Sequence, residues 1–450
     1  MLHYASGTPK NDEFQAVENQ LCSHRLLSMY SDYQGGVFRW LKDVQAGVLT
    51  FDDWLASTRD GERRLEQKDR IARRMFGERG LAVDWPGYVE AMREASNRLP
   101  KEPPRHIILD SGAFTAWNKP QNKRVSPVIL DNLIPAYERF LSESDGLFDE
   151  VWLVNLDVIP GEVGRDATPE ETARAIASSD ENLKRLRSEF GNRILPVFHQ
   201  SEGPARLLEV IDQAKGYICL SPTNKILEEK RWSWAMLARC ALSDLDCDVR
   251  THGLATTGND MVRNTTLYSG DSEAWQQHAR YGKVDLIDEE TIIAECPVTK
   301  HVSRENILVE QYTRIENRTQ ARYRGNHISI EENDYERGTG ESLIDQADHF
   351  SLLSNEKQSK IRSAVEKTIA FPLAQIDMRA RSLVNLATFQ EYSGHVSWKA
   401  PTGPTITVHD ANGNEIDPEP YYRKKVEVQP YPTAEARQRF LAMREGYPGL

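Results

Sequence analysis

The feature of this chain that most constrains its fold is a series of short, continuous apolar runs that each end in polar residues. The clearest runs are residues 106–110 and 151–157. Buried strands of a parallel sheet have this pattern, because helices cover both faces of such a sheet. The polar residues at the ends of the predicted strands are Asp110, Asp157, His199 with Gln200, Ser221, His252 and Asp271.

Segments with helical spacing separate these runs, and the alternation predicts a parallel sheet with helical crossovers. Eight strand-helix units fit into residues 1–295, with Leu2–Ala5 as the first strand and Val284–Ile287 as the last. We therefore expect an α/β fold, a (β/α)8 barrel of the TIM type, with a doubly wound open sheet as the alternative.

Two regions depart from this alternation. Residues 33–104 have mainly helical patterning and many basic side chains, and they predict a helical insertion into the barrel domain. Residues 296–450 predict a mixed C-terminal extension for substrate docking or homodimer formation. In it, Asn355–Tyr392 is expected to be one long helix, broken near Pro372, and Tyr312–Arg324 is rich in arginine.

Composition narrows the class of protein. Of the 450 residues, 39% are hydrophobic, yet no run approaches the roughly 18 apolar residues of a membrane-spanning helix. The N-terminus lacks a secretory signal pattern, and the five cysteines form no Cys-x-x-Cys pair, which together indicate a reducing cytoplasm. The net charge of −12 weighs mildly against a nucleic-acid partner, although a local basic groove matters more than the total.

The carboxyl ends of barrel strands meet at one mouth, where active sites lie. Two carboxylates on different strands, Asp110 and Asp271, suit chemistry at a sugar carbon: one attacks the anomeric carbon while the other moves a proton. Phe114 either stacks on a planar base or is a core aromatic beneath the loop. Asp157 either accepts two N–H groups from a guanine edge, assisted by Gln200, or caps a turn.

A family resemblance rests on two short segments. Residues 110–114, Asp-Ser-Gly-Ala-Phe, resemble the Asp-Ser-Gly-Gly-Phe signature of the tRNA-guanine transglycosylase superfamily. Residues 269–275, Ser-Gly-Asp-Ser-Glu-Ala-Trp, follow His252-Gly253-Leu254 and precede Arg280-Tyr281-Gly282. That order is similar to the DNA-directed branch of the superfamily, the 7-deazaguanine DNA transglycosylases of phages and bacteria.

The resemblance implies a pentosyltransferase that exchanges guanine in DNA for a 7-deazaguanine base such as 7-cyano-7-deazaguanine. Asp271 would be the nucleophile that forms a covalent glycosyl-enzyme intermediate, and Asp110 would be the general acid and base. The target guanine would be flipped out or single-stranded. The residues expected to contact substrate are Ser111, Gly112, Phe114, Asp157, His199, Gln200, Ser221, His252 and Gly253.

The chain departs from the tRNA-directed pattern in two ways. Ala113 replaces a glycine, and no Cys-x-Cys-x-x-Cys zinc site follows the barrel, where only Cys296 and His301 are spaced like ligands. We therefore expect neither a metal nor another cofactor. Three alternatives stay open at this point: the same exchange on tRNA, a metal-dependent barrel hydrolase, and an inactive barrel that binds a partner.

Overall fold

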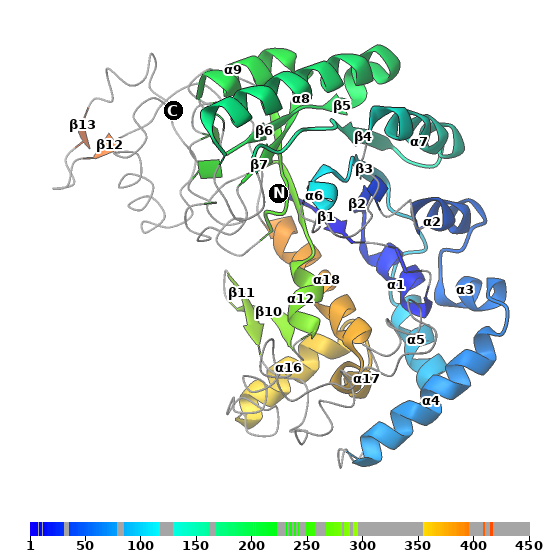
Figure 1. Cartoon of the computed structure of the whole chain (residues 1–450). Helices are drawn as coiled ribbons and strands as arrows, with labels where there is room; N and C mark the ends of the chain where they lie inside the picture. The colour runs from blue at the N-terminus through cyan, green and yellow to red at the C-terminus, as the bar shows by residue number, and fades with distance from the viewer. Residues whose placement is uncertain are drawn as a thin grey trace, which may run out of the picture.

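The computed structural model of the chain (Figure 1) describes a core of strands and helices in the N-terminal two thirds and a helical segment nearer the C-terminus. The described residues are 1–7, 9–10, 12–30, 36–78, 85–117, 129–161, 167–200, 202, 204–222, parts of 231–242, 249–257, 267–280, 283–288, 291–295, 354–395, 408–409 and 415–416. The predicted strand ends all lie within these ranges.

A single parallel sheet forms the core of the domain. Its strands are β1 (Leu2–Ser6), β2 (His24–Ser28), β3 (His106–Asp110), β4 (Glu150–Val154), β5 (Ile194–Leu195), β6 (Val197–His199), β7 (Tyr217–Ser221), β8 (Arg250–Gly253) and β9 (Ser269–Ser272). They are ordered β5-β4-β3-β2-β1-β9-β8-β7-β6. The end strands β5 and β6 are separated only by Pro196, which has no N–H to continue the ladder. The sheet therefore closes on itself as an eight-position barrel, which confirms the predicted TIM-type α/β fold.

Alternate residues of each strand face opposite sides of the barrel wall. Ile108 of β3 packs inside the barrel with Tyr4 of β1 and Cys219 of β7. Its neighbours Ile107 and Leu109 face outward, into the layer between the strands and the surrounding helices. Because both faces are covered, the strand is apolar at every position until it reaches the barrel mouth.

Helices surround the barrel (Figure 1). Those directly connected to the strands are α1 (Glu13–Leu21), α6 (Ala113–Trp117), α7 (Leu130–Glu143), α8 (Pro169–Phe190), α9 (Pro204–Gln213) and α12 (Ala274–Arg280). A capping box begins α8: the Thr168 hydroxyl accepts a hydrogen bond from the Glu171 N–H, and the Glu171 carboxylate accepts one from the Thr168 N–H. That helix start was predicted from the sequence.

Four helices lie between β2 and β3, within the segment for which we predicted an insertion. They are α2 (Gly36–Gln45), α3 (Phe51–Ser57), α4 (Gly61–Glu78) and α5 (Tyr88–Asn97). Phe51, Trp54 and Met92 of these helices pack in one apolar cluster with Phe14 of α1. The inserted helices are therefore anchored on the barrel domain by its first helix.

The prediction that Val284–Ile287 is the last barrel strand is wrong. Residues Val284–Asp288 form β10, which pairs antiparallel with β11 (Thr291–Glu295) in a separate hairpin. Val284 and Leu286 pack against the C-terminal helices instead of the barrel interior. A short apolar run has the same pattern in either place, and β9, which pairs with both β8 and β1, already completes the barrel.

The described part of the C-terminal extension consists of three helices instead of one broken helix: α16 (Asn355–Glu366), α17 (Phe371–Ile376) and α18 (Met378–His395). They cover α1, α12 and β10 (Figure 1). A short pairing of β12 (Val408–His409) with β13 (Glu415–Ile416) follows. The arginine-rich segment Tyr312–Arg324 lies outside the described residues, and a role in docking or dimer formation stays a prediction.

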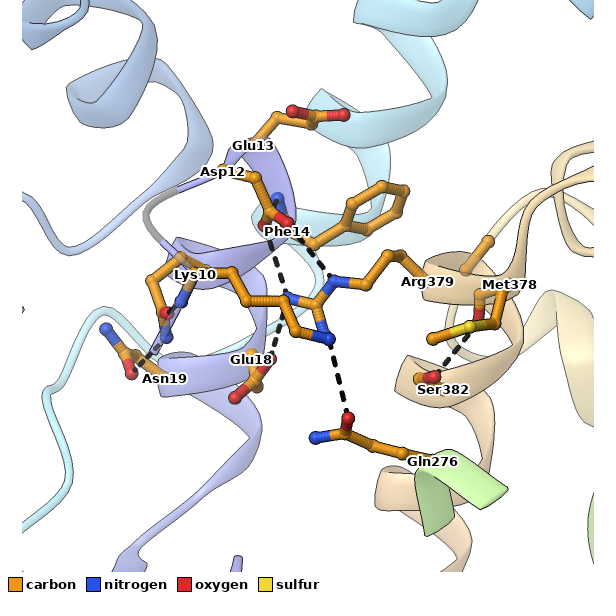
Figure 2. Close-up of polar contacts among 12 residues, drawn as sticks. Lys10, Asp12, Glu13, Phe14, Glu18, Asn19, Gln276, Met378, Arg379 and Ser382 are labelled. Atoms are coloured by element: carbon orange, nitrogen blue, oxygen red, sulfur yellow. Dashed lines mark hydrogen bonds and ion pairs between the residues drawn. The ribbon is translucent and has the colours of Figure 1, made fainter. Parts of the chain in front are cut away.

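A buried ionic cluster joins α18 to α1. Figure 2 shows the guanidinium of Arg379 between the carboxylates of Asp12 and Glu18, at 3.2 and 2.9 Å. Glu18 is also paired with Arg25 of β2 at 2.6 Å. Since an unpaired charge is costly at such a buried place, these contacts specify where the C-terminal helices sit on the barrel. No helix in the described part of the chain has the length and apolar character needed to cross a membrane.

Candidate functional site

Polar side chains gather at the carboxyl end of the barrel, because the inward-facing positions change there from apolar to polar. In β3 the inward residue after Ile108 is Asp110, and in β6 the inward residue after Val197 is His199. The inward-facing polar residues at or near the strand ends are Ser28 (β2), Asp110 (β3), His199 (β6), Ser221 (β7), His252 (β8) and Asp271 (β9). The predicted convergence of these residues at one mouth follows from this register.

Asp110 is the acid with the most perturbed titration in the site. Its pKa is raised from the ordinary 3.8 to about 7, first by burial and then by the negative charges of Asp157 and Asp271, while the Ser28 hydroxyl and the Gly112 N–H act in the opposite direction. The Gly112 N–H donates to Oδ2 of Asp110 at 3.0 Å. Asp110 therefore exchanges its proton near neutral pH, as a general acid and base must.

Asp110 and Asp271 both lie at the carboxyl end of the barrel, although β3 and β9 are separated by β2 and β1 around the barrel. The two side chains are close enough for the charge of Asp271 to raise the pKa of Asp110. The pKa of the buried Cys219 thiol is raised first by burial and then by the charges of Asp157, Asp271 and Asp110. The three carboxylates thus form one cluster at the mouth.

Asp157 and His199 form a buried pair. Oδ2 of Asp157 lies 2.9 Å from Nε2 of His199, and both side chains are nearly inaccessible. Burial alone would lower the pKa of His199, but the hydrogen bond and charge of Asp157 outweigh it and raise that pKa. The backbone N–H of His199 donates to Glu202 at 3.1 Å. Asp157 is thus paired with a side chain from β6 and is more than a turn cap.

Asp271 is held from one side. Its Oδ1 accepts a hydrogen bond from the Ala255 N–H at 3.1 Å and lies 3.3 Å from Nε2 of His252. Ala255 has φ of 54°, the left-handed region that non-glycine residues rarely occupy. Strained backbone of this kind concentrates at functional sites, and here it aims an N–H at a carboxylate.

The segment after β3 carries an exposed aromatic side chain. Phe114 on α6 is 42% exposed, so the alternative that it is a core aromatic is wrong. Gly112 has φ of 84°, and a Cβ there would lie 2.5 Å from Cβ of Tyr30. Ser111 is fully buried, and its hydroxyl accepts from the Ala113 N–H at 3.4 Å. These two residues therefore shape the turn that places Asp110 and Phe114.

The remaining predicted substrate contacts sit on the opposite wall. The Gln200 N–H donates to the Ser221 carbonyl at 3.1 Å, which holds the ends of β6 and β7 together. A Cβ on Gly253 would lie 2.0 Å from Oγ1 of Thr256, whose hydroxyl donates to the Gly253 carbonyl. Gly253 is therefore required for the turn that carries Ala255.

Sequence reasoning missed four residues of the site. Ser28, whose hydroxyl lowers the pKa of Asp110, is the last residue of β2. Glu202, Ala255 and Ser269 contact predicted site residues directly. Ser269 had a usable signal, because it is two residues before Asp271 and so faces the same side of β9.

Within the described residues, no group of three or more His, Cys, Asp and Glu side chains is arranged to hold a metal ion. Cys296 and His301 lie outside the described residues. No protein-family model matches the chain, and no curated protein sequence matches it. The function is therefore argued from the geometry of the site and from the resemblance of its segments.

Proposed function

We propose that this barrel is a base-exchanging transglycosylase that replaces guanine in DNA with a 7-deazaguanine derivative. The observation that carries the proposal is the meeting of Asp110 and Asp271 at one barrel mouth, with Asp110 protonated near neutral pH and Asp271 fixed from behind. A nucleophile and a separate proton carrier are what displacement at an anomeric carbon requires.

In the proposed first half-reaction, a carboxylate oxygen of Asp271 attacks C1′ of the target deoxyribose. The bond from C1′ to N9 of guanine breaks, its electron pair goes to the base, and Asp110 donates its proton to the departing guanine. In the second half-reaction, Asp110 takes the N9 proton of the incoming 7-deazaguanine. The new N9 then attacks C1′ and releases the Asp271 carboxylate, so the enzyme returns to its starting state.

The base would lie between the two acids. The Asp157 carboxylate suits the N1–H and amino donors of a guanine edge, and its pairing with His199 at 2.9 Å keeps it in place. Phe114, which is 42% exposed, offers a ring face for stacking. Since 7-cyano-7-deazaguanine keeps the same donor edge as guanine, one pocket would accept both bases in turn.

The choice of DNA as the polynucleotide rests on the resemblance of residues 269–275 to the DNA-directed branch. The target guanine would be flipped out of the duplex or single-stranded. The proposal includes a cytoplasmic location, which is the host cytoplasm if a phage encodes the chain. The tRNA alternative uses the same site chemistry, and the assay below separates the two substrates.

The test is incorporation of a labelled 7-deazaguanine base into duplex DNA, single-stranded DNA and tRNA by the full chain. We expect incorporation into DNA, and a covalent protein–DNA adduct that survives denaturing electrophoresis when the incoming base is withheld. Asp271→Asn is expected to abolish both signals, and Asp110→Asn to lower incorporation by about 10²-fold or more.

The matched control is Asp131→Asn, the same change at a carboxylate on α7 that is 71% exposed and paired with Arg185 of α8. It is expected to incorporate base like the natural chain. Full incorporation by Asp271→Asn, or no incorporation into any of the three nucleic acids by the natural chain, would contradict the proposal.

A further inference from the structure

A row of polar side chains from three neighbouring strands leads to Asp271. The Tyr217 hydroxyl of β7 is hydrogen-bonded to the Ser269 hydroxyl of β9 at 2.5 Å. Ser269 Oγ lies 2.7 Å from Nδ1 of His252 on β8. The other ring nitrogen, Nε2, is buried, makes no hydrogen bond with any described residue, and lies 3.3 Å from Oδ1 of Asp271.

With a neutral imidazole, one arrangement of protons in this row directs a ring N–H at Asp271. If Tyr217 donates to Ser269, then Ser269 donates to Nδ1 of His252, and the ring proton must be on Nε2, directed toward Asp271. Burial raises the pKa of the Tyr217 phenol well above its ordinary value, so that phenol keeps its proton. The opposite tautomer would direct the Nε2 lone pair at a carboxylate, which is repulsive.

The imidazole of His252 is also closed off from any ligand. It is 0% exposed, and the rings of Tyr4 and Tyr217 pack edge-on against it, with centroids 5.4 and 6.4 Å away. A base in the barrel mouth would meet Asp271 first. We had expected His252 to contact substrate directly, and its surroundings are those of a residue behind the reacting group.

We propose that His252 is a positioning residue that donates from Nε2 to Oδ1 of Asp271 and so directs the other oxygen, Oδ2, toward the sugar carbon. This inference rests on the proposed function of Asp271 as nucleophile. The Ala255 N–H donates to Oδ1 at 3.1 Å, and Nε2 of His252 would be the second donor to the same oxygen, from 3.3 Å. In this structure the His252 contact does not reach the geometry of a hydrogen bond, and catalytic contacts are often long or poorly aligned before substrate binds.

The first experiment determines the tautomer of His252 and needs no substrate. Nitrogen-15 correlation spectra of the full chain, labelled at histidine, report which ring nitrogen carries the proton. His252 is identified by its loss in His252→Gln. We expect a neutral ring protonated at Nε2, and loss of this preference in Ser269→Ala. A ring protonated at Nδ1 only in the natural chain overturns the inference.

The second experiment separates positioning from base contact by kinetics. His252→Leu is expected to slow adduct formation in single-turnover reactions by about 10- to 100-fold, the loss of one hydrogen bond to a charged group, with KM for the incoming base little changed. His252→Gln, whose amide nitrogen can donate from nearly the same place, is expected to recover most of the rate. A merely structural role would not give that recovery.

The control is His278→Gln, the same substitution at a histidine that is 40% exposed and paired with Asp285 on a different element. It is expected to react like the natural chain. A raised KM for the base in His252→Leu with an unchanged adduct rate overturns the positioning role. If the natural chain forms no adduct, the proposed function fails, and the tautomer measurement still decides whether His252 donates to Asp271.

Discussion

Replacing Asp110 by asparagine is expected to stabilise the folded protein at alkaline pH and to leave its stability unchanged in acid. The reason is the raised pKa of this carboxyl, about 7 against an ordinary 3.8, caused first by burial and then by the charges of Asp157 and Asp271. The asparagine keeps the shape of the side chain and removes its negative charge.

The sign follows from proton binding in the two states. Between about pH 4 and pH 7 the folded protein keeps a proton on Asp110, while the unfolded chain has lost it. Unfolding then releases a proton, so the free energy of unfolding falls as the pH rises through this window. At 1.36 kcal/mol for each pH unit, the full effect is about 4 kcal/mol, reached above pH 7.

The assay is urea unfolding of the natural chain and of Asp110→Asn at pH 5 and pH 8. The stability difference in favour of the variant is expected to grow by about 2–4 kcal/mol between the two pH values. Asp131→Asn, at the exposed carboxylate, is expected to show no such growth. An equal difference at both pH values for Asp110→Asn would refute the argument that Asp110 is an acid poised near neutrality.

Two further predictions concern the backbone and the C-terminal helices. Gly112→Ala is expected to lower the free energy of unfolding, measured by urea titration, by at least about 2 kcal/mol, because the added Cβ meets Tyr30. Gly146→Ala, where φ is 73° and nothing lies within 4 Å of the added Cβ, is expected to lower it by only about 1 kcal/mol. Equal losses in the two variants would show that the contact with Tyr30 is unimportant. Arg379→Met is expected to cost about 3–5 kcal/mol by leaving Glu18 partly unpaired, and adding Glu18→Gln is expected to restore part of that loss, which a double-mutant cycle measures.

The sequence was sufficient for the barrel because a parallel strand with helices on its outer side is apolar on both faces, and the run Ile107–Leu109 has this pattern. The capping residues Thr168 and Glu171 were equally local, since both partners of the cap lie within one turn. The same locality explains the error at Val284–Ile287, where a strand of a surface hairpin and a barrel strand have the same pattern.

The strand ends could be located from the sequence, but the relations among their side chains could not. The pairing of Asp157 with His199 joins strands more than 40 positions apart, and the contact of Asp271 with His252 depends on a neighbour chosen by the sheet order. Phe114 shows the same limit: its exposed ring follows from the turn at Gly112, whose φ no residue pattern specifies uniquely.

By itself the sequence determined that polar groups would replace apolar ones where each strand leaves the barrel, because side-chain direction alternates along a strand whatever its neighbours are. Only the tertiary structure decided that carboxylates among those groups are close enough for their charges to raise the pKa of Asp110 to about 7, and that Asp271 lies 3.3 Å from a buried imidazole. Those properties depend on distances across the barrel, and such distances exist only once the sheet has closed.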